Sequence, residues 1–285
     1  MINNKPKVSI GMPVYNAEKY LRKSLGALVS QSFKDFELII SDNASIDGSS
    51  DICKEYSKID ERIKYVRQPV NIGGWENFKY VLNEAQGEFF MWSAADDIRS
   101  LDFIELNYNF LSLNPDYVAS TSPNIMEGEN QEDYKPISFS LNDNDNFQRY
   151  VKFFDYCWQS HGIFYSLIRI HELKECSLLQ ERTEFLGVDW GVNLFLASKG
   201  KINRTVKGQT IFGNNGASQA PDFLQKMRTS YVEFFHPFYK LNMYVLYLSK
   251  PLSLIKRLKI MIILLRLSSK FNFDRFKTKL KQLLR

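Results

Sequence analysis

Short apolar runs alternate with helix-like stretches through the first third of this 285-residue chain. We expect strands at residues 8–12, 36–41, 63–67 and 88–93. Helices are expected at residues 18–30, from the turn at 42–48 to about residue 59, and at residues 75–85. Parallel strands need a long crossover connection, which a helix commonly supplies. The alternation therefore predicts an α/β fold with a mostly parallel sheet flanked by helices.

The remainder of the chain is predicted to continue this sheet and then become helical. A helix to about residue 113 and a strand near 117–122 are followed by an acidic, Asn-rich loop at 127–146. Residues 187–199 have helical spacing, and residues 202–211 are expected to return a strand. From residue 223 onward the pattern is helical and aromatic, then basic. We therefore divide the chain into a domain at 1–217 and a helical C-terminal region at 218–285.

Two acids, Asp96 and Asp97, end the apolar run at residues 89–95. Side chains at the carboxyl ends of parallel strands meet at the edge where open α/β sheets bind ligands. Residues 13–16, 42–45 and 71–73 follow the other three expected strands and should meet the acids there. The alternative is that the acids cap the next helix, for which Asp102 competes.

A crevice lined by acids, amides and small residues suits a nucleotide, because the base and ribose need hydrogen-bond acceptors and the diphosphate needs a cation. Neither the G-x-G-x-x-G fingerprint nor the G-x-x-x-x-G-K-[ST] loop occurs. A dinucleotide-dependent dehydrogenase and a P-loop enzyme are therefore disfavoured.

Three motifs carry a resemblance to a known family: residues 9–16 (SIGMPVYN), 41–48 (SDNASIDG) and 94–97 (AADD). In this order and at these separations they resemble family 2 glycosyltransferases of the GT-A type. The resemblance is strong over residues 7–125, weaker to about 218 and absent in the basic tail. It implies a GT-A-like, Rossmann-like fold and a hexosyltransferase-like enzyme. Such an enzyme transfers a sugar from a nucleoside diphosphate donor, a UDP-sugar being favoured, with inversion at the anomeric carbon.

The same resemblance assigns expected roles to individual residues. Pro13, Tyr15 and Asn16 would border the nucleoside pocket, and Asp42 would accept hydrogen bonds from the base. Asp96 would match the last acid of the family's Asp-x-Asp and bind Mn²⁺ or Mg²⁺ on the diphosphate, with Asp97 nearby. From their place after the third strand, we add Asn71 and Gly73 to the donor site.

An inverting transfer needs a base beside the acceptor hydroxyl. Asp189 lies where the resembling enzymes place that acid, and Glu184 is the reserve candidate. Asp189 alternatively serves only as the N-cap of the helix that follows. We place His161 near the acceptor, and Trp190 either stacks on an acceptor ring or is packed in the core.

The sequence departs from the family pattern at two points. Ala94 stands where the first acid of Asp-x-Asp is usual, so one contact to ribose or metal is missing. Residues 213–218 carry Asn where the family often has Arg and His, so the phosphate or metal contact that Arg or His would make is not expected from that loop.

Charge is distributed unevenly along the chain. Residues 250–285 contain eleven Lys or Arg and one acid, a net charge of +10, which leaves −5 for the rest of a chain whose total is +5. An acidic body with a basic, apolar tail favours an anionic membrane surface as partner over nucleic acid. The apolar run within 252–267 is too short and too charged to span a bilayer. The alternative is a terminal helix that packs its apolar face on the main domain.

Three scattered cysteines, Cys53, Cys157 and Cys176, lack metal-ligand spacing and fit a reducing cytoplasm. From the polar start of the chain we expect no signal peptide. We expect a cytoplasmic enzyme, peripheral to the inner face of the plasma membrane, that adds sugar to a lipid-linked or growing glycan in bacterial cell-surface polysaccharide synthesis. The alternatives are a non-catalytic nucleotide-sugar-binding protein and a sugar nucleotidyltransferase. The latter would need a Gly-rich basic loop after the first strand, where residues 13–16 read PVYN.

Overall fold

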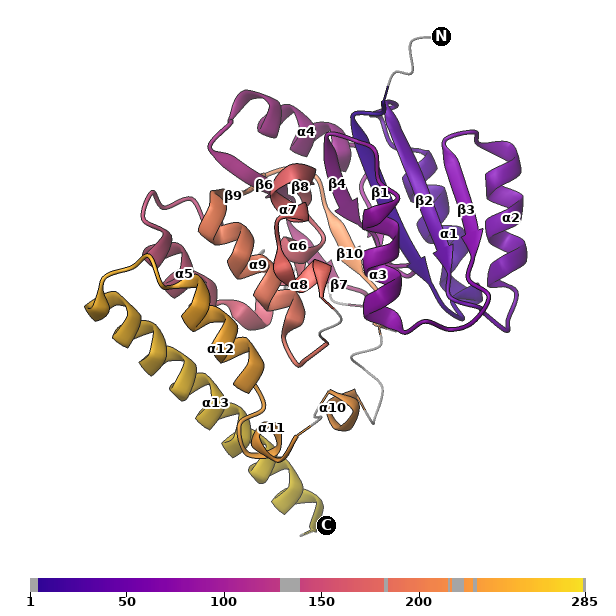
Figure 1. Cartoon of the computed structure of the whole chain (residues 1–285). Coiled ribbons are helices and arrows are strands. Elements are labelled where there is room, and N and C mark those ends of the chain that lie inside the picture. The colour runs from indigo at the N-terminus through magenta and orange to yellow at the C-terminus, as the bar shows by residue number, and fades with distance from the viewer. Residues whose placement is uncertain are drawn as a thin grey trace.

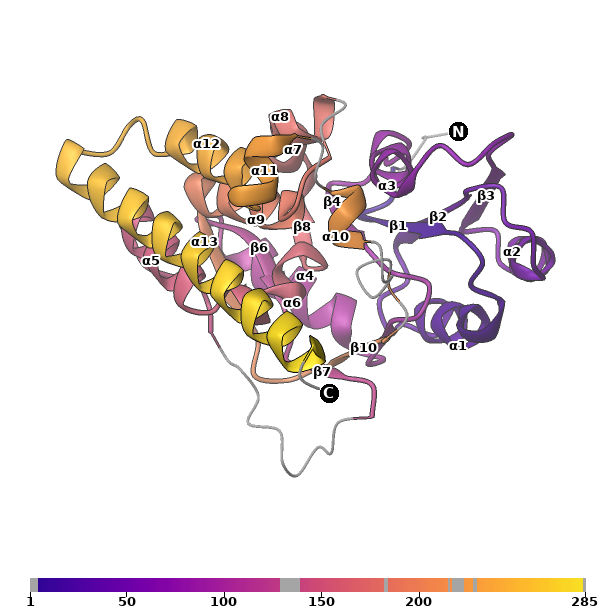
Figure 2. The same ribbon diagram turned by 90° about the horizontal axis from the view of Figure 1, so that it is seen from below.

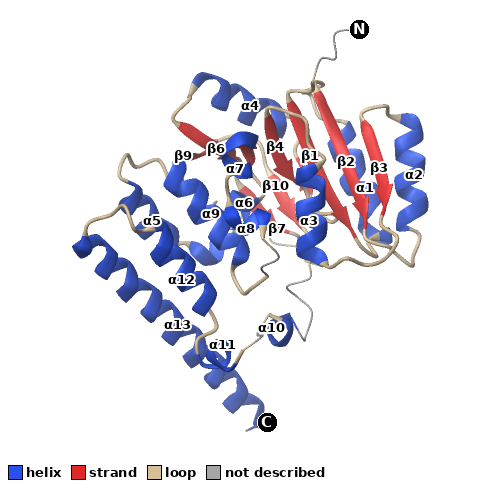
Figure 3. Cartoon of the chain, in the orientation of Figure 1, coloured by secondary structure: helices blue, strands red, loops and turns tan. Residues whose placement is uncertain are grey.

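The computed structural model describes residues 5–128, 139–181, 184–214, 216, 223–227 and 230–283. Figure 1 shows a twisted sheet covered by helices, with the C-terminal helices α12 and α13 lying together at one side of the molecule. Figure 3 separates the strands, which form the middle layer, from the helices on either face. The α/β class with a mostly parallel sheet is therefore confirmed.

Seven strands form the main sheet in the order β3-β2-β1-β4-β8-β6-β9. They are β1 (Val8–Val14), β2 (Phe36–Asp42), β3 (Ile63–Arg67), β4 (Phe89–Trp92), β6 (Tyr117–Thr121), β8 (Leu167–Arg169) and β9 (Lys201–Arg204). Strands β1 to β4 are parallel, whereas β8 is antiparallel to both of its neighbours. A smaller sheet has the order β5 (Ile98–Arg99), β10 (Thr210–Phe212) and β7 (Asn124–Met126).

The strand expected at residues 202–211 is wrong in its extent, because the chain forms two strands there. β9 belongs to the main sheet and β10 to the smaller one. Gly208 lies between them with φ of 76°, a backbone conformation that glycine adopts without strain. The chain turns at this glycine and crosses from one sheet to the other. Part of the loop expected at 127–146, residues 129–138, lies outside the described residues.

Two hydrophobic cores cover the two faces of the main sheet. On one face lie α1 (Glu18–Val29), α2 (Ser49–Ile59) and α4 (Phe103–Leu113). The buried residues Leu21, Leu25 and Leu28 of α1 recur every three or four positions, which puts them on one side of the helix. On the other face lie α3 (Gly74–Asn83), α5 (Asn146–Asp155), α6 (His161–Phe164) and α9 (Val188–Lys199).

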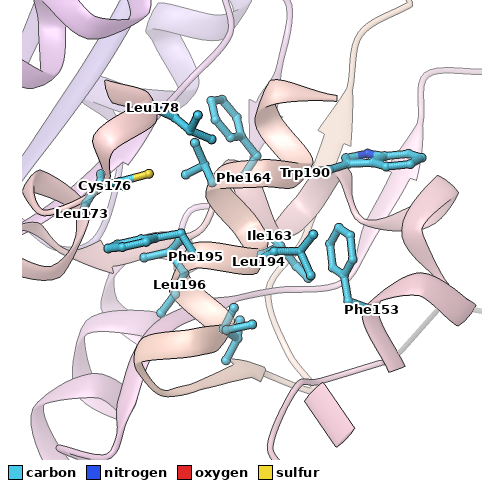
Figure 4. Packing of buried hydrophobic residues seen from close by; sticks show 14 of the residues in the cluster. Phe153, Ile163, Phe164, Leu173, Cys176, Leu178, Trp190, Leu194, Phe195 and Leu196 are labelled. Atoms are coloured by element: carbon cyan, nitrogen blue, oxygen red, sulfur yellow. The ribbon is translucent and has the colours of Figure 1, made fainter. Parts of the chain in front are cut away.

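Helix α9 forms the centre of the second core. Residues 190–197 of this helix are all buried, as expected for a helix surrounded by other elements. Figure 4 shows its side chains interleaved with those of α5, α6, α7 (Ile170–Lys174) and α8 (Ser177–Gln180). The first turn of α9 is therefore held firmly, and it carries Asp189.

The C-terminal region consists of α10 (Phe223–Lys226), α11 (Tyr231–Phe235), α12 (Tyr239–Leu248) and α13 (Leu254–Leu283). Helix α12 contacts α9, and α13 contacts both α12 and α5. Ile260 and Leu264 of α13 are buried in this contact. In the described part of the chain, no helix combines the length and the apolar character needed to cross a bilayer. The division of the chain after residue 217 stays a prediction.

Candidate active site

The parallel strands β1 to β4 bring their carboxyl ends to one edge of the main sheet. Val14 pairs with Asp42, and Asp42 pairs with Arg67, so the loops that follow these strands begin side by side. Trp92, the last residue of β4, pairs with Gly11 of β1, which places the acids after β4 beside the same loops. The edge predicted from the sequence is therefore formed.

The loop after β1 is tied to the loop after β2. Asn16 adopts φ of 50°, and its side-chain Oδ1 accepts the backbone N–H of Ile46 at 2.9 Å. Its own N–H donates to Ser45 Oγ at 3.0 Å. Pro13 is half-buried, whereas Tyr15 is 50% exposed and available to a ligand.

Asp42 is held differently from the expectation. Its side chain is completely buried. Oδ1 accepts the backbone N–H of Ser45 at 2.8 Å, and Oδ2 accepts the Tyr65 hydroxyl and the Arg67 guanidinium, each at 3.1 Å. The carboxylate thus anchors the loop after β2, and this engagement disfavours a direct contact with the base, which stays a prediction.

Asn43, which we did not select from the sequence, joins the loops after β2 and β3. Its Nδ2 donates to Asn71 Oδ1 at 3.0 Å and to the Gly73 carbonyl at 3.2 Å, while its Oδ1 accepts the Ile72 N–H at 2.8 Å. Gly73 has φ of 92° and open space around the position of a Cβ. Asn71 and Gly73 are exposed and lie together, as expected, at the mouth of this junction.

The acids after β4 lie against the loop that follows β10. The Gly213 N–H donates to Asp97 Oδ1 at 3.3 Å. A Cβ on Gly213 would lie 2.2 Å from Asp96 Oδ2, so any larger residue at position 213 would force the Asp96 side chain to move. Neither acid caps α4, because β5 separates them from it and the N-cap residue is Asp102. Asn215, in the same loop, lies outside the described residues.

Asp97 is 3% exposed, and its Oδ2 has no hydrogen-bond partner among the described residues. Burial raises the pKa of Asp97 to about 7; the charge of Arg99 opposes this rise and that of Asp96 adds to it. The Arg99 guanidinium donates to Thr210 Oγ1 at 3.0 Å and to the Trp92 carbonyl at 2.9 Å. Burial lowers the pKa of Arg99 to about 10, with Asp97 opposing. Arg99 therefore fastens the smaller sheet to the end of β4, a role that the sequence pattern did not reveal.

Asp189 is the second residue of α9 rather than its N-cap. The N-cap is Gly187, in the left-handed conformation with φ of 85°. The capping alternative for Asp189 is therefore wrong. Burial raises the pKa of Asp189, while the backbone N–H of Trp190 and the charge of His161 lower it.

Tyr165 connects the two ends of the candidate site. Its pKa is raised by burial and then by the negative charges of Asp97, Asp189 and Asp96, in that order. All three carboxylates are therefore close enough to act on one phenol. The acids after β4 and the acid of α9, which are about ninety residues apart in the sequence, share one neighbourhood. Glu184 lies toward α3, where burial and the charge of Glu76 raise its pKa.

The two residues expected at the acceptor differ in their surroundings. His161 is exposed at the start of α6, with its ring 6.3 Å from that of Phe212 and its charge acting on Asp189. Trp190 is only 6% exposed; its ring stacks on Phe238 at 5.5 Å and meets Trp158 edge-on at 5.0 Å. This packing speaks against Trp190 as a platform for an acceptor ring.

The acids fit a divalent cation that is shared with a ligand. The described residues contain no group of three or more His, Cys, Asp or Glu side chains arranged to hold a metal. Mg²⁺ commonly takes one or two carboxylates and completes its shell with phosphate oxygens and water. Asp96, with the unpartnered Oδ2 of Asp97 beside it, supplies oxygen ligands of this kind.

A family model described as Glycosyl transferase family 2 matches residues 9–170, more than half of the chain. The chain therefore belongs to this family. It is 36% identical over 102 residues to the glycosyltransferase GlyA of Streptococcus pneumoniae serotype 4, and 37% identical over 111 residues to TuaG of Bacillus subtilis strain 168, a teichuronic acid biosynthesis glycosyltransferase by name. These matches cover 36% and 39% of this chain but 14% and 44% of the relatives' own lengths.

A third relative is the Campylobacter jejuni enzyme named GalNAc(5)-diNAcBac-PP-undecaprenol beta-1,3-glucosyltransferase, 36% identical over 93 residues, or 32% of this chain and 30% of the relative. Among solved structures, TarS of S. aureus in complex with UDP-GlcNAc is similar with a TM-score of 0.68 at 17% identity, covering 91% of this chain and 71% of TarS. The mannosyltransferase PcManGT of Pyrobaculum calidifontis, with GDP-Man and Mn²⁺, has a TM-score of 0.51 at 13% identity, covering 99% and 82%. The GT-A-like fold is thereby confirmed.

Proposed function

We propose that this chain is an inverting glycosyltransferase that moves a sugar from a nucleoside diphosphate donor to a hydroxyl of a lipid-linked or growing glycan. The observation that carries the proposal is the placement of Asp96 and Asp97 beside the loops after β1 to β3, since Trp92 pairs with Gly11 and the Gly213 N–H donates to Asp97 Oδ1. The influence of Asp97, Asp189 and Asp96 on the pKa of Tyr165 supports a common neighbourhood for the three acids. Asp96 and Asp97 suit a diphosphate with its cation, and Asp189 suits a general base. Membership of glycosyl transferase family 2 supports the same reaction class.

The donor is expected to lie along the loops after β1, β2 and β3. Tyr15 and Asn16 border this region from one side and Asn71 and Gly73 from the other, with Asn43 holding the loops after β2 and β3 together. A donor placed here has its diphosphate directed toward Asp96. When bound, Mn²⁺ or Mg²⁺ would offset the charge that develops on the leaving nucleoside diphosphate.

Asp189 is proposed to accept the proton of the acceptor hydroxyl as that oxygen attacks the anomeric carbon. A carboxylate that is partly withdrawn from water has a raised pKa and is therefore a stronger base once ionised. A single displacement from the side opposite the leaving group inverts the anomeric centre. The proposal requires Asp189 and the acids after β4 to lie on opposite sides of the anomeric carbon.

The relatives support a choice of donor, cation and acceptor for this chain. TarS was solved with UDP-GlcNAc, which supports a UDP-sugar donor, and PcManGT was solved with GDP-Man and Mn²⁺, which supports the cation. The Campylobacter enzyme's name specifies an acceptor linked to undecaprenol, and TuaG's name specifies teichuronic acid biosynthesis. We therefore propose a role in bacterial cell-surface polysaccharide synthesis, on the cytoplasmic side of the plasma membrane.

Calorimetric titration with UDP, dTDP and GDP, each with and without Mn²⁺, tests the donor site. We expect one nucleotide to bind tightly only with the metal, and D96A to lose that binding. Folded protein that binds none of the three would overturn the proposal. Slow hydrolysis of the matching nucleotide sugar without acceptor is expected of a transferase; a purely binding protein would show affinity but no hydrolysis.

A further inference from the structure

Helix α13 carries two apolar faces, and only one of them is covered by the protein. The covered face contains Ile260 and Leu264, which pack toward α5 and α12. The opposite face is exposed, and we name it the outer stripe. It consists of Leu254, Ile255, Leu258, Met261, Ile262 and Leu265, which are 38–69% exposed. The two alternatives left open by the sequence are therefore combined in one helix, because packing on the main domain uses only half of its apolar surface.

Helical geometry makes the outer stripe continuous. Residues 254, 258, 261 and 265 recur at spacings of four, three and four, and residues 255, 258 and 262 at three and four, so all of them lie on one side. At 1.5 Å per residue the stripe is about 17 Å long. At about 100° per residue, Lys259, Arg266 and Lys270 lie along one border of the stripe and Arg257 lies near the other.

This arrangement of charge identifies what covers the stripe. A second copy of the chain would bring two tails of +10 together, which like-charge repulsion opposes. An anionic bilayer accepts both features, since apolar side chains enter the acyl boundary while lysines and arginines at the border reach the headgroups. We propose that the outer stripe of α13 docks this protein on an anionic membrane surface and presents the Asp189 side of the site to acceptors held in that membrane.

Short contacts connect the docking helix to the proposed base. Phe271, on the covered side of α13, stacks on Trp158 with ring centroids 6.0 Å apart and planes 4° apart. Trp158 in turn meets Trp190, the neighbour of Asp189, at 5.0 Å. Because a helix with its side chains is about 10 Å across, Trp158 lies about one helix diameter from the proposed membrane contact. Figure 2 shows α13 running along the side of the molecule that also carries α5, α6 and α9.

Helix α11 extends the apolar surface at the C-terminal end of the stripe. Asn272 lies on the same side of α13 as the stripe, and its amide donates to the Phe235 carbonyl at 2.7 Å. Phe234, Phe235 and Tyr231 of α11 are all exposed. Aromatic side chains are common at the boundary between headgroups and acyl chains. In Figure 1 α11 lies close to the C-terminal half of α13, to which the hydrogen bond from Asn272 joins it.

Sedimentation of the full chain with vesicles tests the docking surface. We expect binding to vesicles of phosphatidylcholine with 30% phosphatidylglycerol, weaker binding to pure phosphatidylcholine, and weakening in high salt. The double variant L258E/I262E should bind the anionic vesicles at least tenfold more weakly, with an unchanged melting temperature because both side chains are exposed. The matched control is L113E/V206E, which changes two exposed residues outside the C-terminal helices and should bind as the wild type does.

Charge reversal tests the border separately. K259E/R266E should also bind at least tenfold more weakly, at roughly fivefold per basic side chain lost near the surface. K23E/K58E, on α1 and α2, is the control of equal charge change. The inference is overturned if the wild type does not bind anionic vesicles, or if the stripe and control variants bind these vesicles equally. It is also overturned if light scattering shows a dimer that L258E/I262E dissociates.

The role of the stripe in acceptor presentation rests on the proposed glycosyl transfer, but the two fail separately. Vesicle binding requires no nucleotide, and nucleotide binding in solution requires no vesicle. Binding to vesicles but to no nucleotide would support the docking surface and refute the proposed glycosyl transfer. A chain with metal-dependent nucleotide binding and no vesicle binding would retain the transferase and lose the docking surface.

Discussion

One added methyl group at Gly213 is predicted to disable the candidate cation site. A Cβ there would lie 2.2 Å from Asp96 Oδ2 and 2.3 Å from its Cγ. The carboxyl group would have to retreat by about 1 Å to regain van der Waals distance. A displacement of that size in the positioning of a reactive centre costs on the order of 100-fold in rate. We therefore expect G213A to reduce transfer about 100-fold and to weaken Mn²⁺-dependent binding of the nucleotide.

The assay pairs calorimetry, with and without Mn²⁺, with the rate of donor hydrolysis. G26A is the control, because the nearest atom to a Cβ at that position of α1 is the Tyr56 hydroxyl oxygen at an unstrained 3.8 Å. It should keep full activity and gain up to about 1 kcal/mol in helix stability. If G213A folds and matches the wild type in metal-dependent binding and in rate, the placement of Asp96 against the loop after β10 has no part in the reaction.

Two further predictions separate catalysis from stability. D189N should lower the rate of transfer by about 10²–10⁴-fold while sparing nucleotide binding. It should not lower the free energy of unfolding, because it removes a carboxylate whose ionisation is disfavoured by burial. In the wild type, the base becomes protonated as the pH falls through a pKa above the ordinary 3.8. The acid limb of the pH–rate profile should therefore lie at higher pH than that of an exposed carboxylate, and it should disappear in the residual activity of D189N. D42A should lower the free energy of unfolding by about 2–4 kcal/mol, because the Ser45 N–H and the Tyr65 hydroxyl lose their acceptor. Chemical denaturation measures this loss of stability. Normal stability combined with lost nucleotide affinity would instead favour a direct contact between Asp42 and the base of the nucleotide.

The sequence was sufficient to predict the sheet edge because strand ends are local features. The spacing of apolar residues and the positions of turn residues predicted the ends of β1 to β4 to within one or two residues. Neighbouring parallel strands then bring their carboxyl ends to the same edge of the sheet. The grouping of Asp96 and Asp97 with the loops after β1 to β3 followed from that rule. The position of Asp189 came from a resemblance to known enzymes, since about ninety residues separate it from the acids and no local pattern spans them.

Side-chain direction was beyond the reach of the sequence. Asp42 occupies the expected edge, but the partners that draw it inward, Tyr65 and Arg67, lie on the next strand. Trp190 follows the proposed base directly, yet one helical residue is about 100° of rotation, which turns its ring toward Phe238. Arg99 and Gly213 act through a second sheet whose strands are two or three residues long, too short to produce a recognisable period.

The turn that carries Asp96 and Asp97 is formed although Ala94 stands where the family usually has a carboxylate. The Ala94 carbonyl accepts the Ser24 hydroxyl and the Asp97 N–H, each at 3.3 Å. Both bonds use the backbone, so a methyl side chain leaves intact the turn that presents Asp96. A cation held by Asp96 then depends more heavily on oxygens that arrive with the diphosphate. It follows that the cation and the nucleotide should bind together rather than in sequence, because neither partner alone completes the coordination.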